Sequence, residues 1–350
     1  MEFITAMSIP LKERNPVFDV VKALMMLWVI WGHLSLYNVI EPVTSVYMLN
    51  AKIGVNMPVF FVIGGLLAAS TFAAADWSKL LARTISFVWP QAFVAIFYGV
   101  VIALSGGRGA FSWVMGMWFL RTYAVIYILS AIVFRFSDTN GKRWALFIIL
   151  YAVMLFCPSR FRINWFAQVI HMFPYFVFGL MVLKGKALYL DWRIGCLCGV
   201  AYLLAVFFQG DSNVNGMNFW KVNTHWKVVF FSCHECITFF ARTAVGIVGS
   251  LFFLYLINSA VGAIPCLVKL STFGTTSLGI YVMHEYPLYS LGLHCSALPL
   301  PGYSRWLVAM GIFFLCHFAV VLLRRYAFMR FAFFGNEKLL ADGLRRLGMK

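Results

Sequence analysis

Long runs of apolar residues, separated by short polar stretches, recur along the whole chain. Most of them approach the ~20 residues that a helix needs to cross the ~30 Å hydrocarbon core of a bilayer. The runs are continuous and lack the alternation of apolar and polar positions that marks a transmembrane β-strand. The pattern therefore predicts an all-α polytopic membrane protein, with about ten transmembrane helices in one bundle. The expected spans are residues 17–39, 53–75, 84–104, 113–134, 144–157, 165–183, 194–210, 242–262, 274–294 and 306–323.

A further apolar segment, residues 228–241, is too short to span a bilayer alone. Two interpretations stay open: a re-entrant or interfacial piece, or an extension of the span at 242–262. With ten spans, most loop lysines and arginines lie on the side that holds both termini, so the positive-inside rule predicts cytoplasmic termini. If 228–241 crossed the bilayer by itself, the C-terminus would lie outside.

The composition agrees with an embedded chain, because 62% of the residues are hydrophobic and 11% are charged, against roughly 25% charged in a soluble domain. The formal net charge of +16 follows from this topology and from attraction to anionic headgroups, so no nucleic-acid partner is expected. The N-terminus lacks an apolar core followed by a cleavage site, so no cleaved signal peptide is expected. We expect a multi-pass protein of the cytoplasmic membrane, with a transmembrane domain over 1–325 and a basic amphipathic tail over 326–350.

One short pattern suggests metal binding, since Cys233, His234 and Cys236 lie close together. Structural zinc generally takes four ligands, and no second CxxC or HxxxH pattern accompanies this one. We therefore expect no metal site.

Three ionisable side chains, those of Asp19, Lys22 and His33, belong to the first apolar run. A charge in the hydrocarbon costs at least ~2.5 kcal/mol, so such residues usually face the protein interior and have a function. Eleven helical residues turn about 1100°, only ~20° past three full turns, and rise ~16 Å. Lys22 and His33 therefore share one helix face, and Asp19 lies on the same stripe. An acid, a base and an imidazole on one face indicate a site or its frame.

The spacing of Lys22 and His33 resembles the basic-x10-His signature of the acyltransferase 3 family, membrane proteins that O-acylate sugars and other cell-envelope molecules. Four more segments resemble motifs of this family in the same order, and the segment at 56–70 is more similar to the fucose 4-O-acetylase-like branch. The resemblance covers about residues 15–325. The four segments are NMPVFFVIGGLLAAS (56–70), LLARTISFVWP (80–90), MWFLRTYAVIYIL (117–129) and TSLGIYVMH (276–284).

Three positions depart from the pattern of the family. Lys22 stands where many relatives have arginine, and it supplies a point charge in place of a bidentate fork. Ser86 stands where relatives often have a second arginine after Arg83, which weakens the idea that this loop clamps a pyrophosphate. Gly64 replaces a common serine, so no hydroxyl is assigned there.

The resemblance implies transfer of an acyl group, most simply acetyl from acetyl-CoA, onto a hydroxyl of a cell-envelope glycan or glycolipid. Acyl-CoA is then a donor substrate, and no bound cofactor is expected. His33 is the expected general base, because burial favours the neutral imidazole that accepts a proton. Asp19 is the second catalytic candidate.

The expected binding residues divide between the two substrates. Lys22 and Arg83 are expected to bind the CoA phosphates at the cytoplasmic mouth, since acyl-CoA is made inside the cell. Arg121, Trp118 and His284 are the candidates for binding the acceptor, which would arrive from the outer side.

Simpler structural roles stay open for the same residues. Asp19 and Lys22 fit an i,i+3 ion pair at a helix end, with the lysine extending to the interface. His33, His284 and Arg121 could each serve packing or charge balance alone. Two other functions also stay open: a transporter or flippase that uses the first helix as a substrate or proton path, and a family member without catalysis that serves as a partner subunit. The absence of a two-half repeat counts against the transporter.

Overall fold

The computed structural model describes residues 15–36, 46–73, 77–104, 118–156, 166–183, 191–208, 233–285, 287–288 and 302–335, together with residues 340, 342, 343 and 346. Within these residues all regular secondary structure is helical and no strand occurs, which confirms the all-α fold class. The helices are α1 (Pro16–Leu36), α2 (Val46–Ala73), α3 (Trp77–Leu104), α5 (Trp118–Arg135), α6 (Asn140–Phe156), α7 (Phe166–Met181), α8 (Trp192–Phe208), α11 (Cys233–Ala263), the 3₁₀-helix η2 (Pro265–Leu270), α12 (Ser271–Thr275), α13 (Ser277–Met283), α15 (Gly302–Leu323) and α16 (Ala327–Phe334).

The expected number of about ten transmembrane helices is not confirmed, although every expected span overlaps helical residues in the described part of the chain. Among the described residues, six helices are long and apolar enough to cross a bilayer, or seven if η2, α12 and α13 form one bent span. Helices α6, α7 and α8 contain only 17, 16 and 17 residues. They reach about 24–26 Å at 1.5 Å per residue, which is short of the ~30 Å hydrocarbon core. Apolar composition thus marks embedded helices without fixing their lengths.

The short apolar segment at 228–241 runs into α11. Its described part, from residue 233 onward, is continuous with the expected span at 242–262 in one helix of 31 residues. The segment therefore extends that span, and this excludes the re-entrant alternative for the part from 233 onward. Residues 228–232, and the side chains of Cys233, His234 and Cys236, lie outside the described residues.

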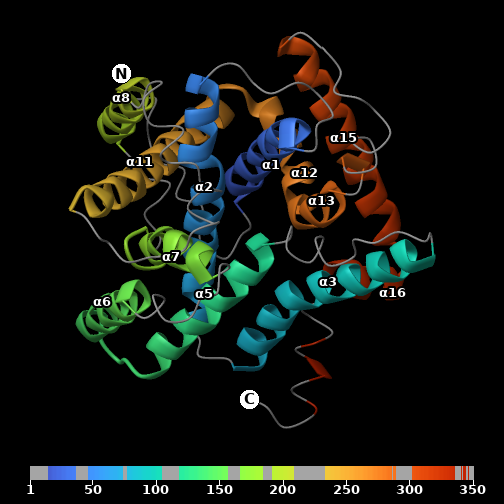
Figure 1. Cartoon of the computed structure of the whole chain (residues 1–350), viewed down its shortest axis with the longest axis horizontal. Coiled ribbons are helices and arrows are strands. Elements are labelled where there is room, and N and C mark those ends of the chain that lie inside the picture. Colours follow the sequence, from blue (N-terminus) through green and yellow to red (C-terminus); the bar gives the residue numbers. More distant parts are fainter. Residues whose placement is uncertain are drawn as a thin grey trace.

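Helix α1 lies between two hydrophobic cores and is surrounded by other helices (Figure 1). Val21 and Met25 belong to a core shared with α2, α5 and α7, whereas Met26 and Ile30 belong to a core shared with α13, α15 and α16. In its apolar window 67% of α1 is buried, against 22% for α11 and 28% for α15. The helix that carries the predicted catalytic residues is therefore central, and α11 and α15 are peripheral.

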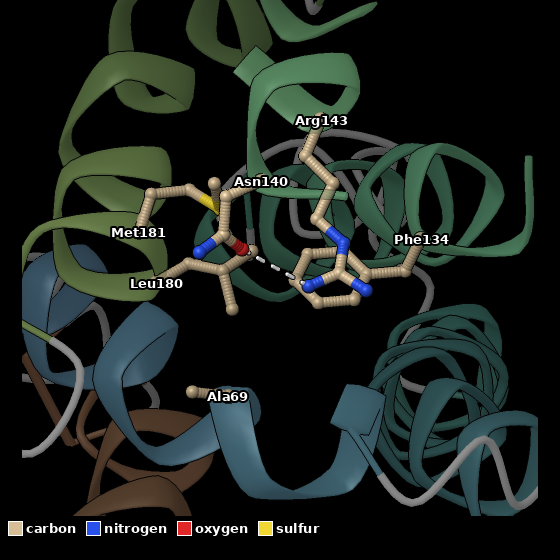
Figure 2. Close-up of a pocket in the computed structure, with 6 residues that line it drawn as sticks. All are labelled: Ala69, Phe134, Asn140, Arg143, Leu180 and Met181. Carbon is tan, nitrogen blue, oxygen red and sulfur yellow. Dashed lines mark hydrogen bonds between the residues drawn. The ribbon is translucent and has the colours of Figure 1, made fainter. Parts of the chain in front are cut away.

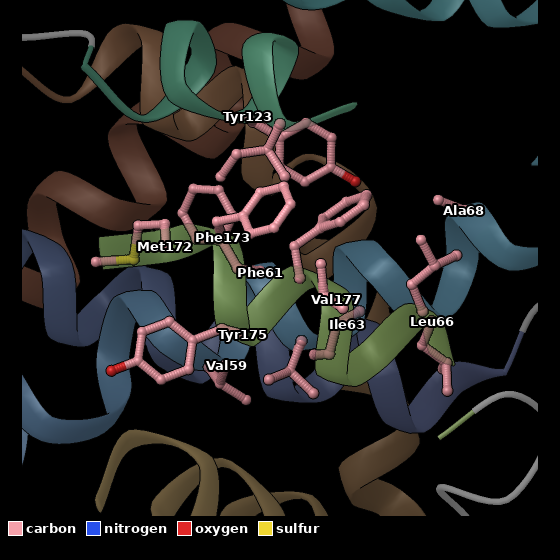
Figure 3. Packing of buried hydrophobic residues seen from close by; sticks show 14 of the residues in the cluster. Val59, Phe61, Ile63, Leu66, Ala68, Tyr123, Met172, Phe173, Tyr175 and Val177 are labelled. Atoms are coloured by element: carbon pink, nitrogen blue, oxygen red, sulfur yellow. The ribbon is translucent and has the colours of Figure 1, made fainter. Parts of the chain in front are cut away.

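Two glycines allow α2 and α7 to pack very closely. A Cβ at Gly65 would overlap the backbone oxygen of Phe176, and a Cβ at Gly179 would overlap that of Val62. Small residues at a crossing let transmembrane helices approach backbone to backbone, where dispersion replaces the hydrophobic effect as the main attraction. Aromatic and branched side chains from α2, α5 and α7 fill the space around this contact (Figure 3).

The ninth expected span is broken, because η2 and α12 end at Thr275 and α13 starts at Ser277 after a 51° bend. The guanidinium of Arg324 donates to the Thr275 carbonyl at 3.3 and 3.4 Å. The hydroxyl of Thr276 donates to the Phe273 carbonyl at 2.8 Å. A break at membrane depth needs such partners for its backbone groups, and it brings the start of α13 beside α1.

The C-terminal tail starts with α16, which packs against α3 and α13 and buries Ala332, Phe333 and Phe334. Gly335 follows with a φ of 56°, and a Cβ there would overlap the backbone of Ser86. Only glycine suits this left-handed position and this close approach. Ser86 is consequently buried under the tail.

Candidate active site

Asp19 and Lys22 form an ion pair in the first turns of α1, with 2.6 Å between Nζ and Oδ1. Asp19 is 3% exposed, whereas the lysine side chain is 20% exposed. Because α1 is one uninterrupted helix, the i,i+3 spacing alone brings the two groups together. The backbone carbonyl of Asp19 lies so close to Gly274 of α12 that a Cβ there would overlap it. The ion pair is thus fixed in a tightly packed part of the fold.

Lys22 borders a cavity of about 170 Å³ that lies between α1, α2, α3, α5 and α13. Arg83 of α3 borders the same cavity, so the structure brings together the two residues expected to bind the donor. Most of the wall is apolar, with aromatic rings from α2, α3 and α5. Among the described lining residues there are two cations and no carboxylate. The cavity suits a largely apolar ligand that carries an anionic end.

Arg83 lies inside α3, although the sequence placed it in the loop before this span. The helix starts at Trp77, seven residues earlier than expected, because the segment ahead of residue 84 continues the helical pattern. The Arg83 Nη1 donates to Thr71 Oγ1 at 3.4 Å, and the guanidinium carbon lies 5.9 Å from the centre of the Tyr127 ring. These contacts hold the arginine against the cavity wall.

His33 and His284 form a hydrogen-bonded pair between α1 and the end of α13. The distance from His33 Nδ1 to His284 Nε2 is 2.9 Å. The ring planes differ by 11° and the centroids are 5.1 Å apart, so the rings meet through their nitrogen edges. His284 is completely buried. The residue expected to act as general base and a residue expected to bind the acceptor therefore form one hydrogen-bonded pair.

The hydrogen bonds of His284 determine the direction of this pair. Its Nδ1 lies 2.7 Å from the backbone oxygen of Tyr281, and a carbonyl oxygen can only accept. Nδ1 of His284 therefore carries the hydrogen, and in the neutral ring Nε2 must accept. His33 then donates from Nδ1, which leaves the lone pair of its neutral ring on Nε2. This tautomer is the one that can take a proton from a substrate at Nε2.

Tyr281 connects the cavity to the histidine pair. It lines the cavity, while its backbone oxygen accepts from His284. Its hydroxyl accepts from the backbone N–H of Phe119 at 3.3 Å. On α1, Val29 lines the cavity one helical turn before His33. The cavity therefore ends next to the histidine pair on both walls.

The remaining expected residues lie farther from the pair. Asp19 precedes His33 by 14 residues, about 21 Å along a helix, so the structure does not bring these two catalytic candidates together. Trp118 packs against the core around α2, α5 and α7 and is not among the cavity's lining residues. Arg121, one turn after Trp118, is half-buried and interacts electrostatically with Tyr281. The two α5 residues therefore flank the site without joining the histidines.

Sequence reasoning missed two tyrosines of the site. Tyr281 was present in the quoted segment TSLGIYVMH, three residues before His284, and this spacing on a helix was the available signal. Tyr123 borders the cavity, and a Cβ at Gly64 would overlap its ring. The glycine in place of a common serine thus makes room for the ring that carries the Tyr123 hydroxyl.

A second, smaller cavity of about 30 Å³ lies between the ends of α5, α6 and α7 (Figure 2). There the Arg143 guanidinium donates to Asn140 Oδ1 at 3.3 Å and lies over the Phe134 ring at 4.3 Å. The volume is enough for about one or two water molecules. It shares no lining residue with the larger cavity, so it is not part of the candidate site.

Comparison with known families agrees with the geometry. A family model described as an acyltransferase domain matches residues 15–325, which contain every candidate residue named above. A search of curated proteins and a search of solved structures gave no match. The match extends over most of the chain, and the apolar helices agree with a multi-pass membrane protein. The chain therefore belongs to the acyltransferase 3 family and is a membrane acyltransferase.

Proposed function

We propose that this protein transfers an acyl group, most simply acetyl from acetyl-CoA, to a hydroxyl of a cell-envelope glycan or glycolipid. The observation that carries the proposal is the directed hydrogen-bond chain from His33 through His284 to the Tyr281 carbonyl. These hydrogen bonds lie at the end of an apolar cavity that is lined by two cationic side chains, those of Lys22 and Arg83. Together they supply a base and a donor site for acyl transfer.

In the proposed reaction His33 is the general base. Its Nε2 takes the proton from the acceptor hydroxyl as the oxygen attacks the thioester carbonyl, and a tetrahedral intermediate forms. Collapse of the intermediate breaks the carbon–sulfur bond and leaves an ester on the acceptor. The departing thiolate takes the proton from His33 and leaves as free CoA, so the enzyme returns to its first state. No oxidant, metal or covalent enzyme intermediate is needed.

His284 orients and stabilises the base. Because its Nε2 accepts from His33 Nδ1, it fixes the ring tautomer that leaves His33 Nε2 unprotonated. When His33 becomes an imidazolium, this hydrogen bond becomes charge-assisted, and such bonds are roughly twice as strong as neutral ones. The arrangement resembles the way an acid orients the histidine of a hydrolytic triad, with a neutral imidazole in place of the acid. We thus assign His284 to positioning rather than to acceptor binding.

The cavity with Lys22 and Arg83 is the proposed donor site. Both cations border one volume, and positive side chains favour the phosphates of CoA. The pantetheine arm would lie along the apolar wall, past Met26 and Val29, toward His33. Asp19 holds Lys22 through its ion pair and serves as its counter-ion, which agrees with the distance between Asp19 and His33.

The proposal also gives the site a direction across the membrane. Lys22 is near the start of α1, and His33 lies about 16 Å farther along it. With a cytoplasmic N-terminus in the cytoplasmic membrane, the donor phosphates stay inside and the histidine pair lies in the outer half. The acceptor then reaches His33 from the outer side, near Trp118 and Arg121.

A turnover assay tests this function. Protein purified into lipid nanodiscs is incubated with radiolabelled acetyl-CoA and an extract of envelope polysaccharides and glycolipids. The proposal expects ester-linked label on the extract and release of one CoA thiol for each ester. No thiol release, together with gradient-driven uptake of extract components into proteoliposomes, would support the transporter alternative instead.

A further inference from the structure

The donor cavity ends one helical turn before the histidine pair. Val29 on α1 and Tyr281 on α13 line the cavity, and the two histidines follow them by four and three residues. Neither His33 nor His284 is among the lining residues. A thioester in this cavity must therefore pass whatever side chain stands between its end and His33.

Phe119 is the aromatic lining residue beside Tyr281, and the ring centre of Tyr281 lies 5.5 Å from that of His284. The ring centre of Phe119 lies 5.3 Å from that of Tyr281, the residue whose carbonyl fixes His284. Its backbone N–H also donates to the Tyr281 hydroxyl. On its other sides the ring packs edge-on against Phe60 and Phe61, with centroid distances of 5.8 and 5.1 Å. The phenyl ring is thus held in place by α2 and α13.

From this placement we infer that Phe119 sets the size of the acyl group that the enzyme accepts. The inference rests on the proposed function and adds the substrate class: CoA thioesters of short acyl chains. The thioester carbonyl must reach His33, so the acyl carbons beyond it must fit beside the Phe119 ring. A fixed aromatic ring leaves room for acetyl and clashes with longer chains. An apolar pocket discriminates about 10-fold to 200-fold for each methylene that it excludes or loses.

The expected effect of removing the ring follows from the same geometry. Phe119→Ala opens the end of the cavity toward the histidine pair, so longer acyl chains gain space and acetyl loses a contact. Phe87 is the matched control, because it lines the same cavity but lies one turn after Arg83. Its ring packs on Tyr123 at a centroid distance of 4.6 Å, on the side of the cavity near Arg83.

The experiment compares acetyl-, butyryl- and hexanoyl-CoA as donors for the wild type, Phe119→Ala and Phe87→Ala in nanodiscs, with the envelope extract as acceptor. The ratio of kcat/KM for hexanoyl-CoA to that for acetyl-CoA should rise at least about 10-fold in Phe119→Ala and change less than about threefold in Phe87→Ala. Phe119→Leu, which keeps most of the volume, should move the preference toward butyryl-CoA and serves if the alanine variant does not fold.

Two results would overturn the inference while the proposed function stands: a wild type that uses hexanoyl-CoA as well as acetyl-CoA, or folded Phe119 variants with an unchanged ratio. An equal change of the ratio in Phe87→Ala would also overturn it, since the effect would then belong to the cavity as a whole. Absence of turnover with all three donors in the wild type would remove the proposed function and this inference with it.

Discussion

The hydrogen-bonding capacity of three groups, rather than their charges, gives the histidine pair its direction. The Tyr281 carbonyl can only accept, so His284 donates to it from Nδ1 and accepts from His33 at Nε2. His33 therefore donates from Nδ1, and its Nε2 carries no hydrogen. Each of the two neutral rings then has a defined tautomer. In this arrangement Nε2 of His33 carries the lone pair that can accept a proton.

The role of His284 can be tested by replacing only its accepting atom. In His284→Gln the side-chain oxygen can accept from His33 Nδ1, whereas His284→Leu has no acceptor. We expect His284→Leu to lower kcat about 10-fold to 100-fold, which corresponds to loss of one charge-assisted hydrogen bond. His284→Gln should recover a large part of this loss, with KM for both substrates unchanged. Equal damage in both variants, with folding intact, would contradict a role through hydrogen bonding.

Lys22 tests the assignment of the donor site. Lys22→Ala removes one of two cations beside the cavity, so KM for acyl-CoA should rise about 10-fold while kcat changes little, as expected for the loss of a hydrogen bond to a charged group. Arg83→Ala should act in the same direction. The measurement is initial rate against acyl-CoA concentration at saturating acceptor. A rise only in the acceptor KM would contradict the assignment.

Substitution of Asp19 distinguishes a role as counter-ion of Lys22 from a role as catalytic acid or base. Asp19→Asn keeps the shape but removes the charge that holds Lys22. The counter-ion role predicts a several-fold change in the donor KM and a kcat within about threefold of wild type, since the distance of about 21 Å to His33 excludes direct contact. A loss of kcat as large as that expected for His33→Ala, about 100-fold or more, would place Asp19 in the chemistry.

Single residues also show where sequence reasoning succeeds. The cost of charge in the hydrocarbon was enough to select Lys22 and His33, and helical geometry was enough to place them on one face. The pairing of His33 with His284 could not be predicted in this way, because the two residues are 251 positions apart and only tertiary packing joins them. The sequence showed that Gly64 departs from the family pattern, but it did not show the reason, which is the space taken by the Tyr123 ring.

At the scale of helices, the contact between α2 and α7 brings Phe61 and Phe176 together against the Tyr123 ring of α5. The two backbones approach at Gly65 and Gly179, where no side chain fits. Helix boundaries decide chemistry as well: because α3 starts at Trp77, Arg83 projects from a rigid helix into the cavity wall. The break between α12 and α13 allows Ser277 to border the same cavity.

Substitution at this helix crossing should reduce stability more than activity per folded molecule. Gly65→Ala places a Cβ on the Phe176 carbonyl, so the helices must separate, at a cost of about 1–3 kcal/mol. Gly311→Ala in α15 is the matched control, because nothing lies within 4 Å of its Cβ. Thermal unfolding in detergent should show a lower Tm for Gly65→Ala and an equal or higher Tm for Gly311→Ala. Equal Tm values for the two variants would contradict the close packing.

The pattern of apolar runs in the sequence predicted the positions of the helices well and their lengths poorly. Each apolar run became helical, because in a bilayer a helix satisfies every backbone group internally. The lengths depend on packing and polar ends: α11 gained residues from the segment before it, whereas α6, α7 and α8 are short. The bend after Thr275 had no clear signal, since its stabilising contact comes from Arg324, 49 residues later.

In the whole molecule, α1 lies between the two cores, which bury 67% of its apolar window. One central helix thereby carries Lys22 near one end and His33, the proposed base, near the other. The family match over residues 15–325 covers this arrangement as a unit. The proposed reaction, in which a cytoplasmic donor meets an outer acceptor, needs such a path through the centre of the protein.

The most direct test of the account is the rate of acetyl transfer by His33→Ala beside the wild type, both in nanodiscs and with the same envelope extract. The account predicts that acetyl-CoA binding and thermal stability persist while kcat falls about 100-fold to 10,000-fold, the usual contribution of a general base. Comparable kcat values in the two proteins would remove His33 from the chemistry and, with it, the central role of the histidine pair.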